Sequence, residues 1–175
     1  GAALTEFKGH ILPDALLPSE PVLLQWTVAV DRIERRNRRM NEVAEELHAL
    51  WGAEGIVPLL KKGQGVALFY EYPLLRECGD IDWCFANEEL EQRALRMIQN
   101  HGVSARKSPD GSIYYRWKEV DIEHHTRLVD LYNPLACRYL KKLEQTEEQS
   151  RVYLKPGKGE PVEVASPLLN LLLLD

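Results

Sequence analysis

The sequence has few cysteines, and their spacing argues against the structures that cysteines most often build in small domains. Its 175 residues contain three of them, Cys78, Cys84 and Cys137, which form neither a Cys-x-x-Cys pair nor an even set. Neither a disulfide framework nor a zinc knuckle is therefore indicated. We expect a protein of a reducing, cytoplasmic compartment.

Long hydrophobic runs are also missing. The longest apolar stretch, residues 168–174, is interrupted by Asn170 and is far shorter than the roughly 20 residues that span a bilayer. Residues 1–8 lack the basic start and apolar core of a secretion signal. We expect no transmembrane helix and no membrane partner. Because the chain stops inside an apolar run without a helix-stop signal, we also expect that a C-terminal helical part is missing.

Positive charge is in deficit. Lysine and arginine number 22 against 27 aspartate and glutamate residues, which gives a net charge of -5. Binding of nucleic acid through bulk positive charge is therefore not expected. The one basic run, residues 32–39, falls in a helical pattern and is interpreted as a solvated helix face with acids nearby.

What the sequence has is the composition of a globular domain. Hydrophobic residues make up 45% of the chain, enough to bury a core. Apolar residues at three- and four-residue steps after Ser19 predict a long helix that ends near Gly52. We expect residues 1–55 to form an N-terminal helical region that packs on a core of residues 56–175.

The core alternates between strand and helix patterns. Asn87 is expected to cap a helix over residues 88–100, and Ser108-Pro109-Asp110-Gly111 is a typical hairpin turn. Together the patterns predict a mixed sheet with helices, of the α+β or α/β class. Strands are expected at residues 56–60, 81–85, 103–107, 113–118, 120–125, 152–155 and 161–164, and further helices at 66–70, from Pro134 to about 145 and from Pro167.

Two segments carry acidic residues in a strand pattern. Alternation along a strand places Asp80 and Asp82 on one face, roughly 6 to 7 Å apart. Two such carboxylates repel each other unless a cation lies between them, and Mg²⁺ prefers oxygen ligands. In residues 120–125, Asp121, Glu123 and His125 share one face, so a neighbouring strand is able to supply a third carboxylate. His124 points to the other side and is expected in the core or at an interface.

These segments resemble the polymerase-β-like nucleotidyltransferases, in which acid-apolar-acid on one strand is joined by a third acid on a later strand. More narrowly, the chain resembles an uncharacterised bacterial branch of that superfamily over about residues 55–130. The matching motifs are Leu60-Lys61-Lys62-Gly63-Gln64-Gly65, Tyr72-Pro73-Leu74-Leu75-Arg76, Gly79-Asp80-Ile81-Asp82 and Ile122-Glu123-His124-His125. The superfamily's usual Gly-Ser turn is absent, and Lys62-Gly63-Gln64 stands in its place.

The resemblance implies a nucleotidyltransferase-like mixed sheet and transfer of a nucleoside monophosphate from a nucleoside triphosphate to an acceptor hydroxyl, with release of pyrophosphate. The acceptor is left open as a small molecule, a protein or an RNA. Two Mg²⁺ ions are implied, with Mn²⁺ as a substitute. Asp80, Asp82 and Glu123 are the implied metal ligands and catalytic residues, with Asp121 as the alternative third acid. The implied nucleotide and phosphate contacts are Lys62, Gly63, Gln64, Arg76 and Gly79.

Two other functions stay open at the level of the sequence. The altered glycine turn is compatible with a catalytically degenerate member that binds a nucleotide or a protein partner. The same acids together with His125 are also compatible with a metal-dependent phosphoesterase.

Overall fold

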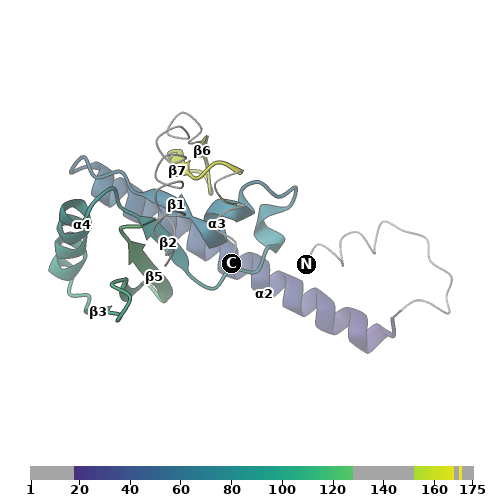
Figure 1. The fold of residues 1–175 in the computed structure, drawn as a ribbon. Helices are drawn as coiled ribbons and strands as arrows, with labels where there is room; N and C mark the ends of the chain where they lie inside the picture. The colour runs from purple at the N-terminus through teal and green to yellow at the C-terminus, as the bar shows by residue number, and fades with distance from the viewer. Residues whose placement is uncertain (1–17, 128–151, 168–169, 171–175) are drawn as a thin grey trace.

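The computed structural model describes residues 18–127, 152–167 and 170 (Figure 1). They form a mixed α+β fold, as the sequence predicts. Labels follow Figure 1. The elements are α2 (Glu20–Gly52), β1 (Leu59–Lys61), α3 (Lys62–Ala67), the 3-10 turn η2 (Pro73–Leu75), β2 (Ile81–Cys84), α4 (Glu88–Asn100), β3 (Ala105–Lys107), β4 (Ile113–Trp117), β5 (Val120–His125), β6 (Val152–Leu154) and β7 (Val162–Val164).

The strands of the described residues form one seven-stranded sheet in the order β3-β4-β5-β2-β1-β7-β6. The β2–β5 and β1–β7 pairs are parallel and the other neighbours are antiparallel. The parallel β2–β5 pair lies at the centre of the sheet and brings together the two acidic segments of the sequence. The mixed sheet is therefore confirmed, and its central pair positions the candidate site.

The strand register builds a continuous row of polar residues across five strands. Arg106 on β3 pairs with Tyr114 on β4, and Tyr114 pairs with Glu123 on β5. Glu123 in turn pairs with Asp82 on β2, and Asp82 pairs with Lys61 on β1. Because paired residues point to the same side of a sheet, all five side chains lie on one face. We call this set the polar row.

The opposite face of the sheet is apolar and packs against helices. Trp51 near the end of α2 is fully buried and contacts Trp83, Phe85 and His124, with ring centroids 5.4–5.5 Å apart. His124 is itself fully buried, which confirms that it belongs to the core. Trp83 and His124 are each next in sequence to a residue of the polar row, so the core holds the strands that carry the site.

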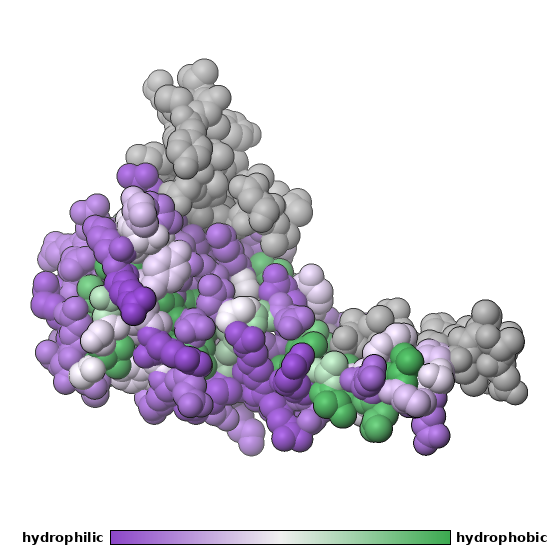
Figure 2. Space-filling view, turned by 90° about the horizontal axis from the view of Figure 1, so that it is seen from below, coloured by the Kyte–Doolittle hydropathy of each residue, from purple (hydrophilic) through white to green (hydrophobic). Residues whose placement is uncertain are grey.

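Among the described residues, helix α2 packs on the fold through its second half. It begins at Glu20 after Ser19, and its buried residues run from Asn37 to Trp51. The first half extends beyond the sheet (Figure 1) and exposes apolar side chains such as Leu24 and Val28, where Figure 2 shows a hydrophobic patch. Although α2 has 33 residues, no described helix carries the apolar stretch that crossing a membrane would require.

Most predicted elements are found, with shifted ends. The helix over residues 88–100 is confirmed, and Asn87 caps it by accepting a hydrogen bond from the Leu90 amide at 2.9 Å. Strand β1 begins at Leu59 rather than at residue 56, because Pro58 has no amide hydrogen for a strand ladder. The two predicted hairpins are confirmed as the antiparallel pairs β3–β4 and β6–β7.

The short helix expected at residues 66–70 lies earlier, at Lys62–Ala67. Lys62 has a φ of 49°, and the backbone of Gly63 (φ 6°, ψ -100°) kinks the helix, so the turn and the helix overlap. The helix expected from Pro134 to about 145 lies outside the described residues. Of the last predicted helix, only Pro167 and Asn170 are described in helical conformation.

Gly65 sits where α3 turns back against β1, and it offers a test of this packing. A Cβ atom on Gly65 would lie 2.7 Å from the Leu60 carbonyl oxygen and 3.3 Å from a methyl group of Val164. We expect Gly65→Ala to lower the free energy of unfolding by about 1 to 3 kcal/mol, as overpacking usually does. Urea denaturation measures this. The control Gly52→Ala, with open space around its Cβ, should be neutral or slightly stabilising.

Candidate active site

Asp82, Glu123 and His125 converge on the polar side of the central β2–β5 pair. The Nε2 atom of His125 lies 3.0 Å from Oδ1 of Asp82 and 3.1 Å from Oε1 of Glu123. All three residues are at least nine-tenths buried, with exposures of 5%, 9% and 9%. Buried carboxylates this close need positive charge or strong hydrogen-bond donors to be stable.

Hydrogen bonds hold Glu123 in its charged form. Burial alone would raise the pKa of Glu123, but hydrogen bonds from His125 and Tyr114 outweigh it and lower the pKa to about 2. The Tyr114 hydroxyl donates to Oε1 at 2.6 Å. Burial lowers the pKa of His125, but its hydrogen bonds to Asp82 and Glu123 raise the pKa by more. The pKa of His125 is therefore raised overall. Hydrogen bonds among Asp82, Glu123 and His125 therefore favour the ionised form of the acids.

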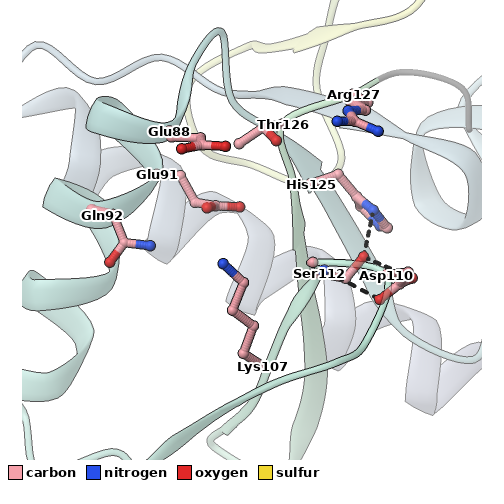
Figure 3. Close-up of a pocket in the computed structure, with 10 residues that line it drawn as sticks. Glu88, Glu91, Gln92, Lys107, Asp110, Ser112, His125, Thr126 and Arg127 are labelled. Carbon is pink, nitrogen blue, oxygen red and sulfur yellow. Dashed lines mark hydrogen bonds between the residues drawn. The ribbon is translucent and has the colours of Figure 1, made fainter.

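The β3–β4 turn fixes the orientation of the His125 ring (Figure 3). Nδ1 of His125 lies 3.2 Å from the Ser112 hydroxyl, which donates to Asp110 at 3.3 Å. These residues line a cavity of about 110 Å³ that also contacts Glu91 and Lys107. Because Nδ1 is occupied by Ser112, Nε2 is the nitrogen that faces the two carboxylates. Outer-shell contacts of this kind commonly orient histidines that ligate metals.

Asp80 lies at the edge of the cluster. It is half-buried, and burial together with the charges of Asp82 and Glu123 raises the pKa of its carboxyl. It lines a second cavity, of about 390 Å³, on the side of the site toward β4. The structure thus brings Asp82 and Glu123 together and places Asp80 within electrostatic range of both. Asp121, the alternative third acid, lines the same second cavity and pairs with Arg116 at 3.8 Å.

The glycine turn lies against the acids from the side of β1. A Cβ atom on Gly63 would be 3.2 Å from the Asp80 carbonyl oxygen and 3.9 Å from Oδ2 of Asp82. The guanidinium of Arg76 donates to the Gly63 carbonyl and contacts the Cys78 sulfur, both at 3.1 Å. Arg76 therefore braces the turn in this structure, and Gly63 provides the close backbone approach.

The other predicted phosphate contacts, Lys62, Gln64 and Gly79, differ in exposure and in their partners. Lys62 is exposed at the start of α3. Gln64 is buried and donates to Asn37 of α2 at 3.3 Å, within the interior. Gly79 is exposed, and its carbonyl accepts a hydrogen bond from Arg36. Arg36 thus contacts the residue that precedes Asp80. Arg35 and Arg38 instead pair with acids one helical turn away on α2, as expected of a solvated helix face.

Sequence reasoning missed four residues of the site: Lys61, Asp110, Ser112 and Tyr114. Lys61 is only 3% exposed, pairs with Asp82 in the strand register, and its ammonium group donates to the Arg127 carbonyl at 3.4 Å. Burial lowers the pKa of this lysine. Alternation within residues 113–117 would have placed Tyr114 on a polar face, but only the strand register shows that it faces Glu123.

Tyr114 gives a test of the acid cluster. We expect Tyr114→Phe to weaken divalent-metal binding about tenfold, because the hydrogen bond that orients Glu123 is lost. Isothermal titration with Mn²⁺ measures the affinity. Tyr153→Phe removes an equivalent hydroxyl from an exposed tyrosine on β6 and should change nothing. Equal affinities in all three proteins would contradict the orienting role.

The donor set fits a divalent cation. One ligand atom from each of Asp82, Glu123 and His125 can be chosen so that all three lie within 4.8 Å of one another. Two carboxylate oxygens and one imidazole nitrogen suit Mn²⁺ and related ions, and the carboxylates suit Mg²⁺. These residues, with Asp80 beside them, would hold the metal.

Comparison with known proteins agrees with this geometry. A family described as uncharacterised nucleotidyltransferase matches residues 10–174, which is nearly the whole chain. No curated protein and no solved structure matches the chain. The chain belongs to this uncharacterised nucleotidyltransferase family.

Proposed function

We propose that this chain is a Mg²⁺- or Mn²⁺-dependent enzyme that moves a nucleoside monophosphate from a nucleoside triphosphate to an acceptor hydroxyl. The observation that carries the proposal is the meeting of Asp82 and Glu123 on adjacent parallel strands, with the Gly63 turn against them. Family membership supports the reaction class.

In this reaction the acceptor oxygen forms a bond to the α-phosphorus, the bond from that phosphorus to the bridging oxygen breaks, and pyrophosphate leaves. The acceptor proton passes to a carboxylate of the site or to water. Asp82 and Glu123 would hold a divalent ion, which would neutralise charge on the phosphoryl oxygens and lower the pKa of the attacking hydroxyl.

The chain's own residues position these groups. Tyr114 orients Glu123 through the hydrogen bond described above, and Ser112 holds the His125 ring. Gly63 lets the turn pack closely against the acidic strand, since a Cβ atom there would lie 3.2 Å from the Asp80 carbonyl oxygen. Arg76 fixes the turn, and Lys62 is exposed next to it, where an ammonium group is available to a phosphate.

Metal removal tests this function. With an α-labelled nucleoside triphosphate and Mg²⁺ or Mn²⁺, label should move to an acceptor fraction and pyrophosphate should appear. After chelation, triphosphate affinity is expected to fall about a hundredfold, because the acids then repel the phosphates. Calorimetric titration with and without chelator measures this. Metal-independent affinity together with absent transfer would instead indicate a degenerate binding protein.

The histidine at the metal cluster favours one second candidate, a metal-dependent phosphoesterase that uses Asp82, Glu123 and His125. Such an enzyme releases inorganic phosphate from p-nitrophenyl phosphate in the presence of Mn²⁺. Phosphate release without pyrophosphate release would favour this candidate over nucleotidyl transfer.

A further inference from the structure

The second cavity lies beside the acid cluster and is lined by residues of β3, β4 and β5. Its volume is about 390 Å³, within the range of small-molecule sites. Asp80 and Tyr114 are part of its wall, and the Tyr114 hydroxyl donates a hydrogen bond to Glu123 at 2.6 Å, so the cavity and the acid cluster share a border. Other residues of its wall are Ser104, Arg106, Arg116 and Asp121.

Two arginines in this wall are available to a ligand. Arg106 stands opposite Tyr114 in the β3–β4 register, and it forms no ion pair with any residue that the structure describes. Arg116 lies 3.8 Å from Asp121, but both side chains are about two-thirds exposed, at 67% and 65%. Such exposed pairs contribute little to stability, so a ligand anion can replace Asp121 at small cost.

The position of the cavity relative to the glycine turn indicates which substrate it takes. The Gly63 turn follows β1 and approaches Asp82 from one side, whereas Tyr114 and Arg106 lie on the other side of the β2–β5 pair. An in-line displacement needs the incoming hydroxyl and the leaving pyrophosphate on opposite sides of the α-phosphate. With phosphates at the turn, the acceptor lies in the cavity.

We propose that this cavity binds the acceptor, and that the acceptor carries a phosphate or carboxylate group held by Arg106 and Arg116. The Tyr114 ring forms the wall between that anion and the acid cluster, so the acceptor's hydroxyl is directed toward Asp80. Arginine forks match both phosphate and carboxylate geometry. The identification of the ligand as an acceptor rests on the proposed nucleotidyl transfer. Binding of the anion by the two arginines does not depend on turnover.

Nuclear magnetic resonance of the arginine Nε groups tests the site in the full chain. Inorganic phosphate, and in a separate arm acetate, is titrated into protein saturated with Mg²⁺ and α,β-methylene ATP. We expect saturable shifts of the Arg106 and Arg116 signals, and the arm with the tighter response identifies the class of anion. The double variant Arg106→Ala/Arg116→Ala should bind that anion about tenfold more weakly and keep its affinity for the nucleotide analogue.

Other results would overturn the proposal. If the nucleotide analogue alone shifts both arginine signals and the double variant binds it about tenfold more weakly, the cavity belongs to the nucleotide. Absence of a saturable response to either anion would show that no anion site exists. The control Arg96→Ala removes an exposed arginine of α4 and should leave anion binding unchanged. A protein that shows no nucleotidyl transfer but still binds the anion at these arginines would contradict the proposed function and leave the anion site supported.

Discussion

Replacement of Asp82 by Asn is expected to lower nucleotidyl transfer by roughly a thousandfold, because a metal ligand contributes several kcal/mol of transition-state stabilisation. Asp82 is 5% exposed and accepts the hydrogen bond of His125, and it lies opposite Glu123 on the neighbouring strand. The amide has the same shape and keeps an oxygen for His125, so the fold should survive.

Transfer of an α-labelled nucleoside triphosphate measures the loss, and urea denaturation checks the fold. Asp31→Asn is the matched control, because Asp31 is an exposed residue of α2 that pairs only with Arg35 among the described residues. Its transfer rate should be that of the unaltered protein. If Asp82→Asn keeps a tenth or more of the rate, the proposed role of Asp82 is wrong.

Replacement of Trp51 by Ala should have the largest effect on stability, a loss of about 3 to 5 kcal/mol in the free energy of unfolding. Its ring is fully buried and meets Trp83 and His124 edge to face, so it joins α2 to both strands that carry the acids. Loss of the ring leaves a cavity directly behind the site. Metal affinity should fall as well, since the carboxylates depend on the spacing of these strands.

Urea denaturation and Mn²⁺ titration measure the two effects of Trp51→Ala. Leu24→Ala, at a position 64% exposed on the same helix, is the control and should change the unfolding free energy by no more than about 0.5 kcal/mol. A small effect of Trp51→Ala, equal to that of the control, would contradict the supporting role of this core.

The elements that local rules determine were predicted well. The α4 helix has a capping asparagine and an acidic first turn, and it spans the predicted residues. Alternation correctly separated His124, which lies in the core, from His125, which faces the acids. Both signals are carried by neighbouring residues, so no tertiary information was needed.

The composition of the site depended on strand register, which the sequence does not determine. The pairing of Asp82 with Glu123 follows from the parallel β2–β5 alignment between distant segments. A difference of one position changes the environment of a residue: Lys61 ends β1 and is a buried member of the polar row, whereas Lys62 begins α3 and is exposed. The Asp110 turn was recognised as a hairpin signal, but its contact with His125 through Ser112 is tertiary.

A crystal structure of the protein with Mn²⁺ and α,β-methylene ATP tests the account most directly, because manganese is located by its anomalous scattering. We expect a manganese peak within coordination distance of carboxylate oxygens from both Asp82 and Glu123, with the triphosphate beside Gly63. A fully bound nucleotide whose metal contacts neither of these carboxylates would contradict the proposed metal site.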